Sequence, residues 1–221
     1  MNNTPENDLV LMNEHQEDTK EMIFGKANKK RLNRLVEIIP ENTNLLVDIG
    51  CSHGYITDMF RKKAKKVIGI DFVPAHIEQA KALFPDVEFV VGDAVNFTLN
   101  EPVDVIVASE IIEHAKNPEI MLNNFYNNLK QGGVLIITTP NSRSFSKRIK
   151  LALGMKADSV PAHLSYFTKK SLQEILIKCG FKIDLFSSNK EISLKNVYVD
   201  CLNDELSNTF IVRCIKGDKI C

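Results

Sequence analysis

Short, continuously apolar runs recur along the chain and alternate with longer, amphipathic stretches. A parallel strand covered on both faces gives such a continuous run, whereas a strand with one wet face alternates apolar and polar residues. The clearest example is Leu45, Leu46, Val47 and Ile49, which are interrupted by Asp48 and followed by Gly50. Buried strands of this kind are predicted within Asn44–Tyr55, Lys66–Asp71, Val87–Val91, Val103–Ala108 and Val134–Thr139.

The stretches between these runs predict helices. Apolar residues at mixed three- and four-residue steps indicate an amphipathic helix, or a pair of short ones, over Glu21–Ile39, which Pro40 ends. Further helices are expected over Tyr55–Lys63, from Pro74 onward, from Asn117-Pro118 to about Lys130 and over Lys169–Cys179, with last strands over Phe181–Ser187 and Asn208–Ile215. Strands that alternate with helices predict an α/β domain with a mostly parallel sheet and helices on both faces.

Length and composition bound the domain organisation. The chain has 221 residues, of which 44% are hydrophobic, which is enough for one domain with a sizeable core. Residues 1–20 are polar and show no periodicity, so a flexible N-terminus is expected before a single domain over residues 21–221. The connection Pro140–Ala162 is unusually long and predicts a cover segment at about residues 140–165, with a short helix around Phe145–Leu153. No element is assigned to Asn189–Leu206.

The charge balance argues against a polyanionic partner. Lys plus Arg and Asp plus Glu number 28 each, so no global field favours nucleic acid or an anionic membrane. A small or weakly charged molecule is the expected partner. The basic residues of the first helix and of the cover segment are interpreted as solvated faces, with contact to an acidic or phosphorylated ligand as the alternative; they are Lys26, Lys29, Lys30, Arg31, Arg34, Lys147, Arg148 and Lys150.

The sequence also bears on the compartment. It contains no apolar run of the roughly 18 to 20 residues that cross a bilayer, and its polar start lacks the layout of a signal peptide. A cytoplasmic protein is therefore expected. The odd number of cysteines and the lack of a CxxC pair predict reduced thiols, mostly in packing roles, at Cys51, Cys179, Cys201, Cys214 and Cys221.

Residues suited to ligand binding collect where the predicted strands end. In an open parallel sheet, ligands bind outside the carboxyl ends of the strands. Gly50 and Gly54 follow the first strand and allow close backbone approach. Asp71 ends the second strand about twenty residues later, where a carboxylate accepts ribose hydroxyls. Asp93 follows the third strand and Ser109 follows the fourth, so a nucleoside-type ligand is indicated.

Dinucleotides and S-adenosylmethionine both bind in this geometry. The dinucleotide fingerprint needs a third glycine and a helix N-terminus aimed at a pyrophosphate, whereas the loop here stops at Gly54. Asp48 places a negative charge where a pyrophosphate is repelled and a methionine ammonium is attracted. These residues therefore favour S-adenosylmethionine over a nicotinamide cofactor.

A family resemblance rests on the segments Leu-Val-Asp-Ile-Gly-Cys-Ser-His-Gly, Val-Ile-Gly-Ile-Asp and Val-Val-Gly-Asp-Ala. Together they resemble the class I S-adenosylmethionine-dependent methyltransferases over about residues 42–186. The resemblance implies a Rossmann-like, seven-stranded, mostly parallel sheet with an antiparallel last strand. It also implies that the glycine loop holds the methionine part, the second-strand acid the ribose and the Gly-Asp-Ala turn the adenine. The donor-binding residues so implied are Asp48, Gly50, Cys51, Ser52, Gly54, Asp71, Phe72, Asp93, Ala94 and Ser109, with Ser52 standing where the family usually has glycine.

The second half of the chain indicates which branch of the family it resembles. The segments Val-Ala-Ser-Glu-Ile-Ile-Glu-His-Ala-Lys-Asn-Pro and His-Leu-Ser-Tyr-Phe-Thr are similar to those of the branch that contains the ubiquinone-biosynthesis O-methyltransferases. Many members of that branch methylate hydroxyls of small molecules. The resemblance thus implies a biosynthetic enzyme that transfers a methyl group directly to a hydroxyl oxygen of a small metabolite.

Glu110, Glu113 and His114 have a spacing that suits a metal. On a helical turn, positions i, i+3 and i+4 share a face, so these side chains are expected to converge, with His163 of the cover segment as a fourth ligand. Carboxylates suit magnesium, and imidazole shifts the preference toward manganese or zinc. The small-RNA 2′-O-methyltransferases have a similar arrangement around a metal. In the alternative interpretation Glu110 and Glu113 line the pocket, and His114 packs or acts as a lone general base.

Other functions stay open at this point: a protein that binds the cofactor without catalysis, an RNA 2′-O-methyltransferase and a nicotinamide oxidoreductase. The joint presence of Glu110, Glu113, His114 and His163 argues against the first of these. Zero net charge argues against RNA, and the glycine spacing and the lack of a substrate domain argue against an oxidoreductase. The identity of the acceptor and the oligomeric state are left open by the sequence.

Overall fold

The computed structural model describes residues 26–152, 154, 163–189, 191–194, 197–200 and 206–218. The segment predicted to be a flexible N-terminus, residues 1–20, lies outside them, as do residues 155–162 of the predicted cover segment. No helix among the described residues is long and apolar enough to cross a membrane.

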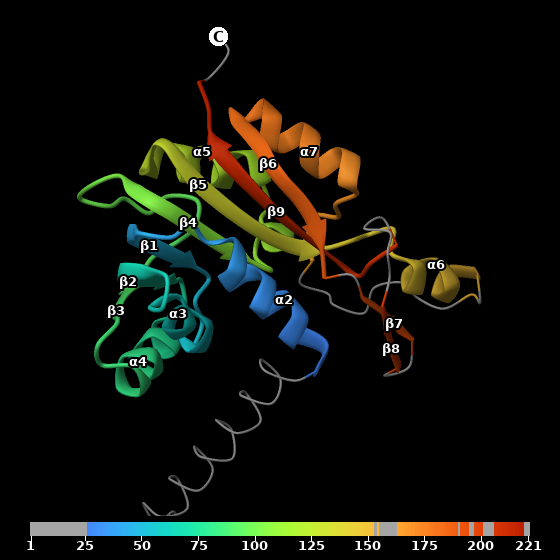
Figure 1. Cartoon of the computed structure of the whole chain (residues 1–221), viewed down its shortest axis with the longest axis horizontal. Helices are drawn as coiled ribbons and strands as arrows, with labels where there is room; N and C mark the ends of the chain where they lie inside the picture. Colours follow the sequence, from blue (N-terminus) through green and yellow to red (C-terminus); the bar gives the residue numbers. More distant parts are fainter. Residues whose placement is uncertain are drawn as a thin grey trace, which may run out of the picture.

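A seven-stranded sheet forms the centre of the fold, with the strand order β3-β2-β1-β4-β5-β9-β6 (Figure 1). Its strands are β1 (Thr43–Ile49), β2 (Ala64–Asp71), β3 (Glu88–Val91), β4 (Val103–Ser109), β5 (Leu129–Pro140), β6 (Phe181–Ser188) and β9 (Thr209–Lys216). Neighbouring strands are parallel except for β9, which runs antiparallel to both β5 and β6. The predicted mostly parallel sheet with an antiparallel last strand is therefore confirmed.

Helices cover both faces of the sheet, as predicted (Figure 1). One face is covered by α2 (Lys26–Ile38), α3 (Tyr55–Phe60) and α4 (Pro74–Leu83), and the other by α5 (Pro118–Asn128) and α7 (Lys169–Lys178). The helix α6 (Phe145–Ala152) projects from the body next to the hairpin of β7 (Glu191–Leu194) and β8 (Val197–Asp200). That hairpin lies in the segment to which no element is assigned from the sequence.

Alternate residues of the central strands feed the cores on opposite faces. Leu46 packs in a cluster with Leu35 of α2, whereas its neighbour Val47 packs in a cluster with Leu122 of α5. Side chains of successive strand residues point to opposite faces, so a strand buried on both sides is apolar throughout. The predicted packing cysteines Cys51, Cys179 and Cys214 are buried free thiols, while Cys201 and Cys221 lie outside the described residues.

Local signals fix several helix ends. The Asn117 side chain accepts hydrogen bonds from the backbone N–H groups of Glu119 and Ile120 (3.1 and 3.3 Å), and Pro118 follows at the first helical position of α5. Thr168 and Ser171 form a reciprocal capping box at the start of α7. The cap at Asn117 holds the first turn of α5 beside the carboxyl end of β4.

The structure corrects two expectations. The helix α5 ends at Asn128, and β5 already begins at Leu129, so Gly132 and Gly133 lie inside the strand, where its register with β4 shifts, rather than before it. Arg31 does not belong to a solvated face, because its side chain is only 7% exposed and donates to Ser109 and Thr138 at the ends of β4 and β5.

Candidate functional site

A cavity of about 610 Å³ lies at the carboxyl ends of β1 to β4, where the strand order reverses. Both the position and the volume are typical of small-molecule sites in open α/β sheets. One wall comes from the ends of β1, β2 and β3, and the other from residues between β4 and the first turn of α5. The lining residues are Ile49, Gly50, Ile70, Asp71, Phe72, Gly92, Asp93, Ala94, Val95, Glu110, Ile111, His114, Ala115, Lys116, Asn117, Ile120 and Met121.

The glycine loop after β1 depends on left-handed backbone. Gly50 and Gly54 have φ angles of 75° and 81°, which glycine adopts without strain. The backbone N–H groups of Gly50 and Cys51 both donate to the Ile70 carbonyl (2.7 and 3.1 Å), which ties the loop to the end of β2. A Cβ on Gly50 would lie 3.1 Å from Cδ1 of Ile111 across the cavity, so a larger residue would narrow the space there.

Asp71, at the end of β2, is held by main-chain donors on both carboxylate oxygens. Oδ2 accepts from the Ser52 N–H and Oδ1 from the Val73 N–H, each at 2.9 Å. The side chain is 7% exposed and lines the cavity, and Nδ1 of His76 lies 3.5 Å from Oδ1. A carboxylate oxygen accepts more than one hydrogen bond, so both oxygens keep capacity for a pair of ligand hydroxyls.

Phe72 and Asp93 lie on the cavity wall beyond Asp71. The Phe72 ring is 73% exposed, which is unusual for a phenylalanine and leaves its face open to a flat ligand. Oδ1 of Asp93 accepts from the Val95 N–H at 3.1 Å, and Ala94 lines the wall beside it. Gly92 precedes this turn. The predicted adenine-side residues therefore lie together at one end of the cavity.

Other predicted donor residues lie behind the wall. Asp48 is buried, and its Oδ2 accepts from Thr57 Oγ1 at 2.6 Å on the α3 side of the sheet. Burial, with the negative charge of Asp71, raises the pKa of Asp48 to about 7. Ser109 accepts from Arg31 and is 3.0 Å from Thr138 Oγ1. Asp48, Cys51, Ser52, Gly54 and Ser109 are not among the residues that line the cavity.

Glu110 has an unusual backbone at the end of β4. Its φ is 57°, in a region that side chains rarely adopt. Thr138 holds it there: the Glu110 N–H donates to the Thr138 carbonyl at 3.0 Å, and Thr138 Oγ1 donates to Glu110 Oε1 at 2.9 Å. Residues with strained backbone are over-represented at functional sites. Because Glu110 also lines the cavity, it is a candidate functional residue.

Glu113 is a buried carboxyl group one turn further on. It lies in the short 3-10 helix η1 (Ile112–His114), is 2% exposed, and accepts from Thr139 Oγ1 at 2.9 Å. Burial and the nearby Glu110 raise the pKa of Glu113 to about 8. Arg31 acts in the opposite direction, since its positive charge lowers that pKa.

Two backbone hydrogen bonds bring His163 to this turn. The N–H groups of Leu164 and Ser165 both donate to the Glu113 carbonyl, at 2.8 and 2.9 Å. The rings of His114 and His163 are 5.0 Å apart, and ligand atoms of Glu113, His114 and His163 all lie within 4.8 Å of one another. These three residues are called the Glu-His-His cluster below.

The expected convergence of Glu110, Glu113 and His114 on one helical turn, with His163 as a fourth ligand, needs correction at Glu110. Glu110 precedes η1 in left-handed backbone, so the i, i+3 geometry of a helix does not apply to it, and its carboxylate accepts from Thr138. It is not part of the Glu-His-His cluster. The cluster thus has one carboxylate and two imidazoles, a donor set that suits manganese or zinc better than magnesium.

A family model described as a methyltransferase domain matches residues 15–185 of the chain. The chain belongs to this methyltransferase family. Within the match lie the glycine loop, Asp71, Asp93 and the Glu-His-His cluster. The predicted resemblance to class I S-adenosylmethionine-dependent methyltransferases is thereby confirmed.

Individual relatives agree with the family at the level of the fold and the donor. A "Probable S-adenosylmethionine-dependent methyltransferase" of Mycolicibacterium smegmatis is 29% identical over 140 residues, which are 63% of this chain and 52% of that protein. The mitochondrial ubiquinone biosynthesis O-methyltransferase of Rattus norvegicus is 36% identical over 110 residues, 46% of this chain and 32% of that protein. The chain thus spans about half the length, or less, of these relatives.

A solved structure shares the fold. The N-methyltransferase NodS from Bradyrhizobium japonicum, in complex with S-adenosylhomocysteine, superposes with a TM-score of 0.61 at 16% identity, covering 86% of this chain and 88% of its own. At this identity the likeness shows the fold alone.

The sequence did not indicate part of the cavity wall. Lys116, Asn117, Ile120 and Met121 line it from the start of α5. The Asn117-Pro118 helix start, which follows directly on the β4 motif, could have indicated this wall. Arg31 was also missed as a buried neighbour of the site, because only the tertiary fold brings α2 under the ends of β4 and β5.

Proposed function

We propose that this chain transfers a methyl group from S-adenosylmethionine to a hydroxyl oxygen of a small metabolite. The observation that carries the proposal is the position of His114. It lines the cavity that also contains Asp71, Phe72 and Asp93, and it belongs to the Glu-His-His cluster. One cavity therefore joins a nucleoside-type site to a group of side chains suited to hydroxyl activation.

The donor side fits S-adenosylmethionine. The diol of its ribose matches the two oxygens of Asp71, and the exposed Phe72 ring offers a face for adenine. Gly50 lines the cavity without a side chain and with left-handed backbone, which suits close approach of the methionine end. When bound, S-adenosylmethionine would supply a sulfonium methyl group: an acceptor oxygen attacks the methyl carbon in line, the carbon–sulfur bond breaks, and S-adenosylhomocysteine leaves.

The acceptor side removes the hydroxyl proton. His114 lines the cavity and receives the proton as a general base, while His163, 5.0 Å away between ring centres, orients it. The hydrogen bond from Thr139 to the buried Glu113 carboxylate holds that side chain of the cluster in place. A divalent cation held by Glu113, His114 and His163 would instead lower the pKa of the hydroxyl before transfer. Both versions use the same three residues.

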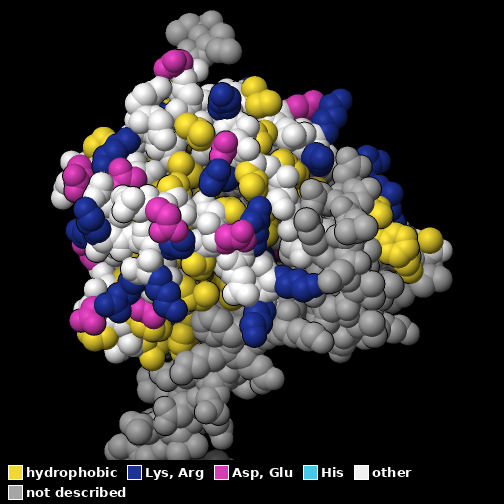
Figure 2. All heavy atoms as spheres, viewed as in Figure 1, with side chains coloured by type: hydrophobic (Ala, Val, Ile, Leu, Met, Phe, Trp, Pro, Cys, Tyr) yellow, Lys and Arg dark blue, Asp and Glu magenta, His cyan; other side chains and the backbone are white. Residues whose placement is uncertain are grey.

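A small acceptor is favoured over RNA. Over the coloured part of the face in Figure 2, lysine and arginine side chains are interspersed with aspartate and glutamate and form no continuous basic stripe. Nucleic-acid binding depends on clustered positive charge along the phosphate backbone. The balanced total of 28 basic and 28 acidic residues agrees with this.

Calorimetry is the first test. We expect S-adenosylhomocysteine to bind and NADH not to bind; tight NADH binding would contradict the donor assignment. A panel of phenols, catechols and carboxylic acids is then offered with labelled methyl donor, in EDTA and with manganese or magnesium. Transfer to a hydroxyl in EDTA supports the general base, and transfer that requires manganese supports the metal. Labelling of amines or of RNA alone would contradict hydroxyl methylation of a small molecule.

A further inference from the structure

Two glycines near the donor loop lie under the same aromatic ring. A Cβ on Gly54 would come within 2.6 Å of Cζ of Phe89, and a Cβ on Gly69 would come within 2.5 Å of its Cδ1. Gly54 also has left-handed backbone, but Gly69 does not, so a side chain at Gly69 is restricted by its neighbours: the Phe89 ring is the nearest, and Sγ of Cys51 follows at 3.0 Å. The structure therefore requires glycine at both positions as long as Phe89 keeps its place.

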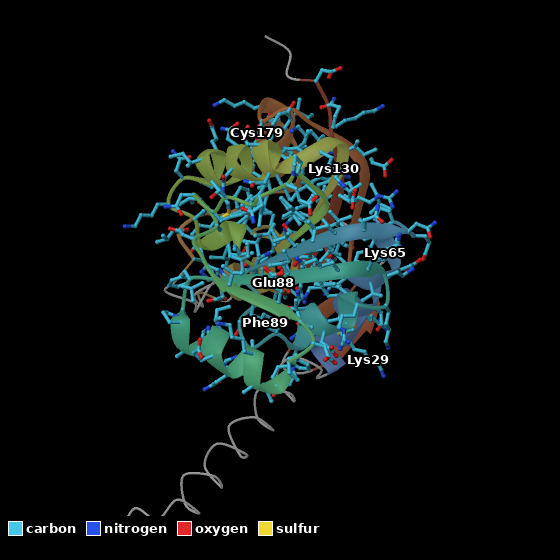
Figure 3. The ribbon with its side chains drawn as sticks, turned by 90° about the vertical axis from the view of Figure 1, so that its left-hand side faces the viewer. Lys29, Lys65, Glu88, Phe89, Lys130 and Cys179 are labelled. Atoms are coloured by element: carbon cyan, nitrogen blue, oxygen red, sulfur yellow. The ribbon has the colours of Figure 1, made fainter. Side chains whose placement is uncertain are left out.

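The strand register explains this contact. Asp48 of β1 is paired with Gly69 of β2, and Gly69 with Phe89 of β3, so the three residues form a row on one face of the sheet. Because Gly69 has no side chain, the Phe89 ring extends over it to Gly54, at the end of the donor loop. Figure 3 looks onto this edge of the sheet, with Phe89 on β3 next to α4.

The ring belongs to a small core of its own. Phe89 is 4% exposed and packs with Cys51, Ile77, Ala80 and Val87 in a cluster distinct from the two larger cores. Cys51 is itself a residue of the donor loop. The loop is therefore supported by a few side chains at the edge of the sheet. Among the buried residues of this small core, Phe89 has the aromatic side chain.

We propose that Phe89 is a positioning residue of the donor site, holding the glycine loop in the shape that binds S-adenosylmethionine. The proposal rests on the proposed function, which assigns this loop to the donor. The loop also supplies the Ser52 N–H that holds Asp71 at 2.9 Å, and β3 leads directly into Asp93. One ring thus links the loop, the ribose acid and the adenine side, although it does not line the cavity.

Substitution of Phe89 tests this through the dissociation constant for S-adenosylhomocysteine. We expect Phe89→Ala to weaken binding about tenfold or more, since a loose support displaces a binding group by a fraction of an ångström or more. Phe89→Leu retains apolar volume, so it should weaken binding less and fold more readily. Each constant is measured calorimetrically at a temperature at which urea titration shows the variant to be folded.

Phe181→Leu is the matched control. Phe181 is 2% exposed in the main core and begins β6, at the opposite edge of the sheet. Its substitution should lower stability and leave the dissociation constant unchanged. Equal weakening by Phe181→Leu and Phe89→Leu, or an unchanged constant in both Phe89 variants, would overturn the proposal. Absence of binding by the unmodified chain would overturn the proposed function, and this inference with it.

Gly69→Ala provides an independent test with the ring intact. The new methyl group would lie 2.5 Å from Cδ1 of Phe89 and 3.0 Å from Sγ of Cys51, so it must displace the ring, and we expect weaker binding of S-adenosylhomocysteine in the unmodified background. In the Phe89→Leu background the methyl group meets less obstruction, and the same substitution should cost less affinity. Strictly additive effects in this double-mutant cycle would argue that the two residues act separately.

Discussion

The two sides of the cavity are fixed by different parts of the chain. On the donor side, main-chain groups hold the key carboxylates: N–H groups bind both oxygens of Asp71 and one of Asp93. On the acceptor side, side chains hold side chains, as Thr138 does for Glu110 and Thr139 for Glu113. The carboxylates of Asp71 and Asp93 thus follow from backbone geometry, whereas the carboxylates of Glu110 and Glu113 each accept a threonine hydroxyl from β5.

The largest expected effect is on the acceptor side. His163→Asn removes one imidazole of the Glu-His-His cluster without touching the cavity lining. Loss of proton transfer or of a metal ligand should lower methyl transfer about 10² to 10⁴-fold. Binding of S-adenosylhomocysteine should change by less than about twofold, because no donor-side contact is altered. Initial rates with an acceptor found in the labelled-methyl panel check the first part, and calorimetry the second.

Glu119→Gln is the control for this prediction. Glu119 is a surface residue that forms an ion pair with Lys178 and takes no part in the cluster. Its substitution should leave the transfer rate unchanged. A His163→Asn variant with a normal rate would show that the cluster is only structural.

A smaller effect is expected from Asp71→Asn on the donor side. Both oxygens of Asp71 accept a hydrogen bond from a main-chain N–H group. In either orientation, the NH₂ group of an asparagine would therefore face one of these N–H donors, and that hydrogen bond would be lost. Loss of hydrogen bonds to a charged group costs about 1.5–3 kcal/mol, or roughly 10- to 100-fold in affinity for S-adenosylhomocysteine.

Asp93→Asn is the matched comparison for Asp71→Asn. The Val95 N–H holds the Asp93 carboxylate through Oδ1, and an asparagine oxygen satisfies that contact. We therefore expect a clearly smaller loss of affinity. If both variants bound S-adenosylhomocysteine equally well, the ribose assignment of Asp71 would be contradicted.

Asp48 allows a test by pH. Its pKa is raised from 3.8 to about 7 in the fold, mainly by burial, so the folded state holds a proton that the unfolded state has lost. This contribution to stability is complete below pH 4 and is lost as the pH rises through 7. At about 1.4 kcal/mol for each pH unit between these two pKa values, the upper limit of the loss is roughly 4 kcal/mol.

Asp48→Asn should remove this pH dependence. Urea unfolding at about pH 5 and about pH 8, on either side of the raised pKa, is expected to show that the variant gains stability relative to the unmodified chain as the pH rises. Thr57, which donates to Asp48 at 2.6 Å, stays in place in both proteins. A stability difference that is the same at both pH values would mean that Asp48 is already ionised in the fold at the lower one.

The same contrast explains how far the sequence could predict the molecule. The apolar runs and the glycine spacing determine the course of the backbone. The pattern therefore predicts the sheet and places Asp71 and Asp93 at strand ends. Arg31 and Thr138 were missed as parts of the site because they come from segments far apart in the sequence. The spacing predicts Glu110 on a helical turn, but hydrogen bonds from β5 hold it in left-handed backbone.

Thr138→Val gives the smallest of the expected effects and tests that last point. Thr138 Oγ1 donates to Glu110 Oε1 and also lies 3.0 Å from Ser109 Oγ, and valine keeps the shape but not these bonds. Stability should fall by about 1 kcal/mol, the usual net value of a hydrogen bond. Methyl transfer should fall only a few-fold, since the Thr138 carbonyl still holds the Glu110 N–H at 3.0 Å. If Thr138→Val lowered the methyl-transfer rate as much as His163→Asn, Glu110 would take part in proton transfer itself. Its side chain would then belong to the same catalytic group as Glu113, His114 and His163.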